Sequence, residues 1–100
     1  MKLDLACLSG TVALVGAGPG DPELLTLRAV RLLERADVVL FDHLVDASIL
    51  AHCSPDALRI FVGKVPDGPR TPQSEIHQLL LQYALEGHFV VRLKGGDPFV

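Results

Sequence analysis

The chain has 100 residues, of which 49% are hydrophobic and 21% charged, and its formal net charge is −3 at pH 7. This length allows one domain with a modest core, and the composition is that of a globular chain with no general basic face for nucleic acid. Two isolated cysteines and the lack of a long apolar run argue against a disulfide framework and a membrane span, so a soluble, cytoplasmic protein is expected.

The first part of the chain predicts a strand followed by a helix. Thr11–Val15 is a short, β-branched apolar run that ends at glycines, which predicts a buried strand. Asp21-Pro22-Glu23 has the form of a helix start, with Asp as the N-cap and Pro in the first turn. The helix that follows is amphipathic, with an apolar stripe of Leu25, Ala29, Leu32, Leu33 and Ala36 opposite Arg28, Arg31 and Arg35.

The rest of the chain repeats this alternation. We expect strands at Val38–Phe41, Arg59–Val62 and Phe89–Leu93, a short helix at Asp46–Cys53, and a loop at Val65–Arg70. Thr71-Pro72 opens a further helix with an apolar face of Ile76, Leu79, Leu80, Tyr83 and Ala84, and Gly87 ends it. Continuous apolar strands separated by helices predict an α/β fold with a mostly parallel sheet and flanking helices.

Chemically distinctive residues follow all four predicted strands. They are Gly16-Ala17-Gly18-Pro19-Gly20-Asp21, then Asp42-His43, then Gly63-Lys64, and finally Lys94-Gly95-Gly96-Asp97. In parallel α/β sheets, ligands bind beyond the carboxyl ends of the strands. We therefore expect glycines, carboxylates and lysines to converge on one edge of the sheet.

The first glycine turn is open to several interpretations. It could be a tight turn into a helix, or a dinucleotide fingerprint, but Asp21 stands where the third glycine of that fingerprint belongs. An anion at that position would repel a pyrophosphate. The second turn, Gly95-Gly96-Asp97-Pro98, repeats the glycine–aspartate–proline pattern. Two such turns on one edge favour a shared pocket for a cationic ligand such as an adenosyl sulfonium.

Asp42 and Lys64 are the candidates for proton transfer. Asp42 directly follows an apolar strand, where a partly desolvated carboxylate could act as a general base, although a capping or loop role is the alternative. Lys64 could be a general acid or a clamp for an anionic substrate, or simply a surface lysine. The four histidines lack metal-ligand spacing, so no metal is expected.

The strings GAGPGDPELLTL and VVRLKGGDPFV, with ADVVLFDHLV, RIFVGK and TPQSEI between them, resemble the tetrapyrrole methylase family, and within it the members that methylate uroporphyrinogen III. The resemblance runs from about Thr11 to Val100. It implies transfer of methyl groups from S-adenosyl-L-methionine to two ring carbons, giving precorrin-2 for sirohaem or cobalamin synthesis. Another precorrin methyltransferase, a dinucleotide-binding module and a non-catalytic assembly domain are the alternatives.

The resemblance also implies roles for individual residues. Asp42 matches the proposed proton acceptor and Lys64 the proposed proton donor. Contacts to the cofactor are implied for Gly18, Pro19 and Gly20 in the first turn, and for Gly95, Gly96, Asp97 and Val100 at the second. His43 stands where arginine is common, Phe41 where tyrosine is common, and Pro66–Arg70 departs from the usual loop, which puts the fine substrate contacts in doubt.

The same resemblance implies an incomplete enzyme. Residues 1–10 would be an N-terminal extension, and residues 11–100 the N-terminal methylase domain, truncated and without the second domain that completes the cofactor site. Such a fragment is expected to have little or no activity by itself. The full-length family members are typically homodimers, with a small tetrapyrrole as substrate and neither nucleic acid nor membrane as partner.

Overall fold

The computed structural model describes residues 11–16, 25–64, 68 and 71–95. Strands and helices alternate along the chain. In order they are β1 (Thr11–Gly16), α1 (Leu27–Arg35), β2 (Val38–Phe41), α2 (Ala47–Leu50), β3 (Leu58–Phe61), α3 (Gln73–Leu85) and β4 (Phe89–Lys94).

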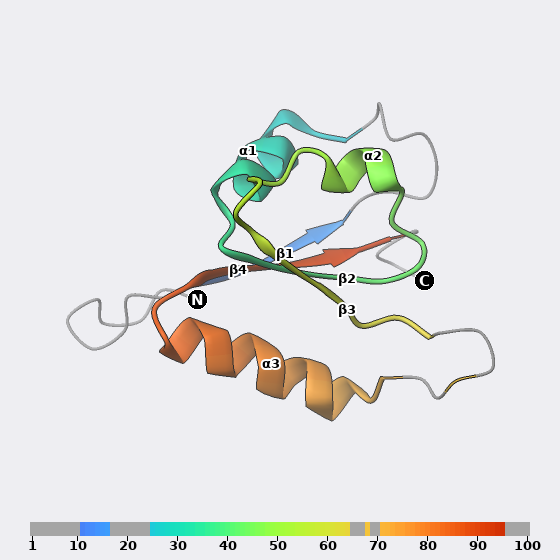
Figure 1. Ribbon diagram of the computed structural model, residues 1–100, viewed down its shortest axis with the longest axis vertical. Helices are drawn as coiled ribbons and strands as arrows, with labels where there is room; N and C mark the ends of the chain where they lie inside the picture. The colour runs from blue at the N-terminus through green and yellow to red at the C-terminus, as the bar shows by residue number, and fades with distance from the viewer. Residues whose placement is uncertain (1–10, 17–24, 65–67, 69–70, 96–100) are drawn as a thin grey trace.

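The four strands form one parallel sheet in the order β1-β4-β2-β3. α1 and α2 cover one face of this sheet, and α3 covers the other (Figure 1). The chain moves outward from β1 through β2 to β3, and then crosses back by α3 to place β4 between β1 and β2. The predicted α/β class with a parallel sheet and flanking helices is confirmed.

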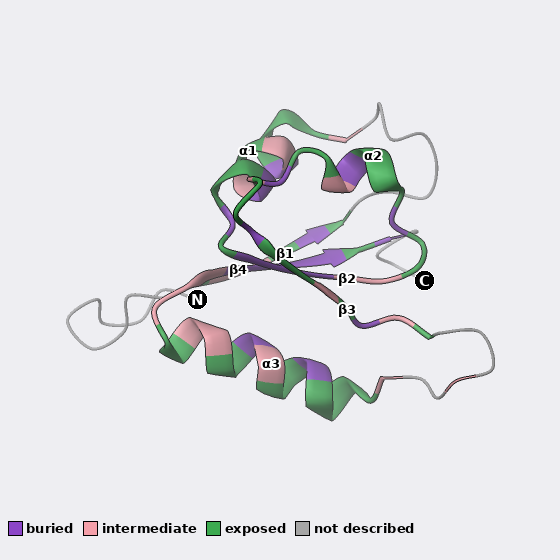
Figure 2. Ribbon diagram, viewed as in Figure 1, coloured by how far each residue is buried: buried purple, intermediate pink, exposed green. Residues whose placement is uncertain are grey.

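Each face of the sheet has its own hydrophobic core. Leu33 of α1 and Ile49 of α2 pack with Val39, Val91 and Leu93 on one face. On the opposite face, Ile76 and Leu80 of α3 pack with Val38, Leu40 and Val90. β2 and most of β4 are therefore buried (Figure 2), which is why β2 is a continuous apolar run and β4 is apolar except at Arg92 and Lys94. Each fully buried Val or Leu side chain contributes about 1.5–3 kcal/mol.

The two outer strands are less buried than expected. β1 and β3 lie at the edges of the described sheet, where Leu14 is 77% exposed and Leu58 is 47% exposed. The prediction that Thr11–Val15 is a buried strand was therefore wrong on burial, although the strand itself is present. β3 also begins one residue earlier than predicted, at Leu58 rather than Arg59. An apolar run predicts a strand but not its place in the sheet.

Three predicted helix boundaries also differ from the structure. α1 begins at Leu27 because the Thr26 hydroxyl caps the helix by accepting from the Ala29 N–H at 3.1 Å. Leu25 and Thr26 are not helical, and the predicted helix start at Asp21-Pro22-Glu23 lies outside the described residues. α3 is capped by Pro72 rather than Thr71, since the fixed φ of proline suits the extended backbone of a cap. α2 ends at Leu50, short of Cys53.

Two predicted helix ends are confirmed. Asp46 is the N-cap of α2, where hydrogen bonds from the backbone and hydroxyl of Ser48 lower the pKa of Asp46. Gly87 follows α3 with a φ of 96°, and its N–H donates to the Ala84 carbonyl at 3.0 Å. This left-handed conformation favours glycine, and it turns the chain into β4.

Asp37 joins three strands at the amino end of the sheet. Its carboxylate Oδ2 accepts from the Phe89 N–H at 2.7 Å, its own N–H donates to the Phe89 carbonyl at 2.9 Å, and its carbonyl accepts from the Leu58 N–H at 2.9 Å. We expect Asp37→Ala to lower the free energy of unfolding by about 1–2 kcal/mol, because one hydrogen bond to a charged group is lost. Urea unfolding measures this free energy, and Asp56→Ala, at another exposed aspartate, is the control. Equal losses of stability in Asp37→Ala and Asp56→Ala would contradict the prediction.

Candidate functional site

The carboxyl ends of β1, β4, β2 and β3 meet along one edge of the sheet. Gly16 of β1 lies opposite Lys94 of β4 in the parallel register, so the two glycine turns leave the sheet from neighbouring positions. β2 is the neighbour of β4 on the other side, and its last residue, Phe41, lies opposite Leu93. This register puts the carboxyl ends of β1, β4 and β2 next to one another, as the sequence predicts for a ligand site.

Asp42 lies at the centre of this edge. Its Oδ1 atom accepts from the Leu44 N–H at 2.9 Å, which closes a turn within its own loop. Its Oδ2 atom accepts from the Gly95 N–H at 3.3 Å, a contact between residues distant in sequence. The carboxylate is half-buried. Asp42 therefore links the loop after β2 to the loop after β4, the segment expected to hold the cofactor.

Two glycines allow the neighbouring loops to pack closely against the loop after β2. A Cβ atom at Gly95 would lie 2.5 Å from the Leu44 carbonyl carbon and 2.8 Å from its oxygen. On the other side, a Cβ atom at Gly63 would lie 2.9 Å from the His43 backbone nitrogen. Real Cβ atoms essentially never come so close to backbone, so both positions require glycine for a steric reason. Asp42–Leu44 is held between these two glycines.

Lys64 and His43 are at the same edge but are exposed. Lys64 directly follows Gly63, and therefore lies in the loop that packs against His43. The structure describes no hydrogen bond or ion pair that joins Lys64 to Asp42. The two candidates for proton transfer are thus in neighbouring loops, one held by backbone hydrogen bonds and the other extended into solvent.

Arg92 is a residue that sequence reasoning missed. It lies in β4 and is only 7% exposed, the one charged residue in the core of the described chain. Its Nη1 atom donates to the Leu93 carbonyl at 3.0 Å. Burial lowers the pKa of Arg92, and the negative charge of Asp42 opposes that effect. The signal was present in the sequence, since an arginine interrupts the apolar run Phe89–Leu93.

The remaining predicted site residues lie outside the described residues. These are Gly18, Pro19 and Gly20 with Asp21 in the first turn, and Gly96, Asp97 and Val100 after β4. Of the predicted site residues, the structure describes Asp42, Lys64 and Gly95, and it brings Asp42 and Gly95 into contact. Within the same described ranges, no three His, Cys, Asp or Glu side chains gather as a metal site would require.

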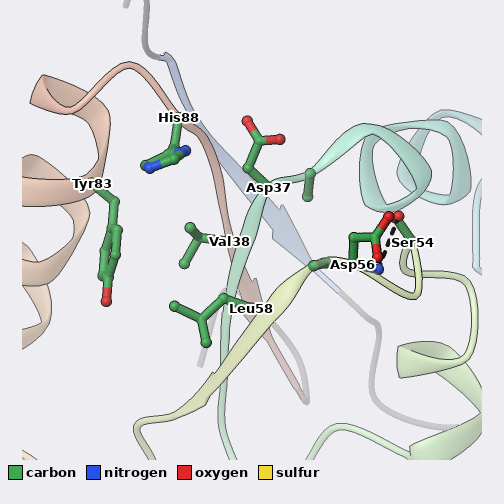
Figure 3. Close-up of a pocket in the computed structure, with 9 residues that line it drawn as sticks. Asp37, Val38, Ser54, Asp56, Leu58, Tyr83 and His88 are labelled. Carbon is green, nitrogen blue, oxygen red and sulfur yellow. Dashed lines mark hydrogen bonds between the residues drawn. The ribbon is translucent and has the colours of Figure 1, made fainter.

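A pocket of about 320 Å³ opens at the opposite end of the sheet (Figure 3). Its polar lining residues are Asp37, Ser54, Asp56, Tyr83 and His88. They surround the starts of β2, β3 and β4, and the Asp37 carboxylate there already accepts from the Phe89 backbone. Of these polar groups, the Asp37 carboxylate joins the amino ends of β2 and β4, and Asp42 is not among the residues that line the pocket.

A parallel sheet with glycine turns at the carboxyl ends of neighbouring strands defines an α/β ligand-binding domain. The chain belongs to the Tetrapyrrole (Corrin/Porphyrin) Methylases, whose family model matches residues 11–100. It is 59% identical over 91 residues to a siroheme synthase from Methylococcus capsulatus, a match that covers 91% of this chain and 19% of that protein. A siroheme synthase from Nitrosomonas europaea is 56% identical over 92 residues.

Solved structures agree with this assignment. The uroporphyrin-III C-methyltransferase of Thermus thermophilus superimposes with a TM-score of 0.77 at 48% identity, covering 92% of this chain and 37% of that one. A structure described as the same enzyme complexed with S-adenyl homocysteine matches at 56% identity with a TM-score of 0.67, covering 89% of this chain and 34% of that one. A cobalt precorrin-4 methyltransferase matches at 33% identity with a TM-score of 0.75.

The chain spans about a fifth of the length of the curated relatives that it matches. Among the described helices, none has both the length and the apolar character needed to cross a membrane.

Proposed function

We propose that this chain supplies the cofactor-binding edge and the proton acceptor of an enzyme that methylates uroporphyrinogen III at two ring carbons, using S-adenosyl-L-methionine, to give precorrin-2. The observation that carries the proposal is the contact between the Asp42 carboxylate and the Gly95 N–H. It joins the residue matched to proton transfer to the loop matched to cofactor binding. The identity to siroheme synthases and uroporphyrin-III methyltransferases supports the choice of substrate.

The described residues fit an adenosyl sulfonium. Gly16 and Lys94 end their strands side by side, so the segments that follow them would both face one ligand, and the Asp42 carboxylate is an anion bonded to Gly95 in the second of these segments. Gly18, Pro19 and Gly20 would hold the cofactor from the first turn, and Gly95, Gly96, Asp97 and Val100 from the second. When bound, the cofactor supplies the methyl group.

The chain's own residues would then orient the substrate and accept its proton. Methylation at a ring carbon requires the donor and acceptor atoms in line, and such positioning supplies much of the rate enhancement. The substituted carbon must afterwards lose a proton, which Asp42 would accept. A placed general base contributes roughly 10²–10⁴-fold. Lys64 would return a proton or pair with a substrate carboxylate from the neighbouring loop.

The charges at this edge suit a substrate that carries many carboxylates. Lys64 and Lys94 are both exposed there, and Arg92 lies beneath them in the core. Exposed lysines attract anionic side chains over a distance of about one Debye length, roughly 8–10 Å in ordinary salt.

The remaining organisation belongs to the full-length protein. Residues 1–10 would be an extension, residues 11–100 would belong to the N-terminal methylase domain, and a second domain would close the cofactor site from the other side. The enzyme would act as a cytoplasmic homodimer on a small tetrapyrrole, without nucleic acid or membrane as partner. Residues 1–100 produced without that second domain are expected to bind the cofactor weakly, because the second domain would form one wall of the cofactor site.

The test is methylation by the full-length protein. Uroporphyrinogen III and isotopically labelled S-adenosyl-L-methionine are incubated with the enzyme in the absence of oxygen. The products are then separated, and their masses are measured by mass spectrometry. We expect a singly methylated product followed by a doubly methylated one. A cobalt-precorrin substrate is the control, because one structural relative is a cobalt precorrin-4 methyltransferase. If the protein methylates the cobalt-precorrin and not uroporphyrinogen III, the proposed substrate is wrong.

A further inference from the structure

A buried arginine on β4 shares a face of the sheet with Asp42. The residues of β2 and β4 that face α3 are Val38, Leu40 and Val90, and by the two-residue alternation of a strand Arg92 faces the same way. Arg92 lies opposite Leu40 in the register. Asp42 is two residues beyond Leu40, so it is the diagonal neighbour of Arg92, within reach of a long side chain.

The Arg92 guanidinium is directed toward the carboxyl end of its strand. Its Nη1 atom donates to the carbonyl of Leu93, the next residue of β4, at 3.0 Å, which holds the guanidinium near the carboxyl end of the strand. The Asp42 Oδ2 atom accepts from the Gly95 N–H at the same end of the same strand. Cation and anion thus lie at the same end of the sheet without a direct ion pair between these two described side chains, and the negative charge of Asp42 favours the charged form of the Arg92 guanidinium.

A buried charge is costly unless another charge compensates it. Arg92 is 7% exposed among aliphatic side chains, whereas the other charged groups of this edge, His43, Lys64 and Lys94, are at the surface. Glu75, in the first turn of α3, is also exposed. Within the described chain, Asp42 is therefore the anion whose position matches the buried cation.

We propose that Arg92 is a positioning residue for the methylation site: its guanidinium is the counter-charge that holds the Asp42 carboxylate against the loop after β4. This inference rests on the function proposed above, since Asp42 matters to catalysis only if that function is correct. Arg92 itself touches neither substrate nor cofactor in this scheme. It acts through Asp42, and a lysine at position 92 would retain most of its effect.

The experiment is a double-mutant cycle in the full-length protein. Arg92→Gln, Asp42→Asn and the combined variant are compared with the wild type in single-turnover methyl transfer, in affinity for S-adenosylhomocysteine and in urea unfolding. We expect Arg92→Gln to slow methyl transfer about tenfold in the wild type, but to change it less than about twofold when Asp42 is already Asn. Arg92→Lys should stay within about threefold of the wild type. Arg31→Gln, on the exposed face of α1, is the matched control.

Equal losses from Arg92→Gln in both backgrounds would show that Arg92 supports only the fold, and would overturn the proposal; so would the absence of any rescue by lysine. If Arg92→Gln does not yield folded protein, Arg92→Lys is used instead, in the wild type and in Asp42→Asn. The small loss of rate caused by Arg92→Lys should then disappear in the Asp42→Asn background. The unfolding cycle needs neither substrate nor cofactor. A wild-type protein that does not methylate therefore contradicts the proposed function, while coupling in urea unfolding still decides whether Arg92 and Asp42 interact.

Discussion

Asp42→Asn is expected to lower the rate of methyl transfer by about 10²–10⁴-fold, because the amide cannot accept the proton lost from the ring carbon. The affinity for S-adenosylhomocysteine should fall by less than about tenfold. An Asn side chain has one oxygen that can accept from either the Leu44 or the Gly95 N–H, so one of the two hydrogen bonds is lost and the other can remain. Single-turnover methylation and isothermal titration calorimetry measure the two quantities separately.

The matched control is Asp46→Asn in the same segment of the chain. Asp46 caps α2 through Ser48 and is exposed, and Asn is as good an N-cap as Asp, so neither methylation nor affinity should change. Unchanged turnover in Asp42→Asn would remove Asp42 from the mechanism. A loss of affinity as large as the loss of rate would instead make Asp42 a structural support of the loop after β4.

Gly95→Ala is expected to have the second large effect. The new methyl group would lie 2.5 Å from backbone and side-chain carbons of Leu44, and neither loop can relieve that contact by rotating a side chain. Overpacking of this kind costs about 1–3 kcal/mol of stability. It would also separate the loop after β4 from Asp42, so we expect affinity for S-adenosylhomocysteine to fall by at least about tenfold, as for the loss of about 1.4 kcal/mol of binding free energy.

Gly87→Ala is the control that distinguishes a loss of stability from a loss of cofactor affinity. Gly87 has a φ of 96°, so alanine there is strained and should destabilise the protein by about 1 kcal/mol. It lies just before β4, however, at the opposite end of the sheet from Asp42, and cofactor affinity should be unchanged. Equal losses of affinity in Gly87→Ala and Gly95→Ala would indicate a general effect of instability rather than a steric requirement at position 95.

Strand and helix order could be read from the sequence because short-range patterns determine them. The apolar runs of β2 and of β4, the latter interrupted by Arg92, predicted strands covered on both faces, and the spacing of Ile76, Leu80 and Tyr83 predicted the inward face of α3. The exact first residue of each helix was harder to predict from the sequence. Thr26, not Asp21, caps α1, since several polar residues near a helix start are all chemically able to cap it.

For the site, the sequence by itself determined which residues follow the strands: Asp42, Lys64 and Gly95, and the glycine turns that mark the tetrapyrrole methylases. Only the tertiary structure decided which of them touch. β4 is last among the strands in sequence, but it crosses back to lie between β1 and β2, and this return brings Gly95 to the Asp42 carboxylate. The same strand order leaves β1 and β3 exposed and buries Arg92. Strand order depends on how helices pack across the sheet, a long-range balance that local periodicity does not encode.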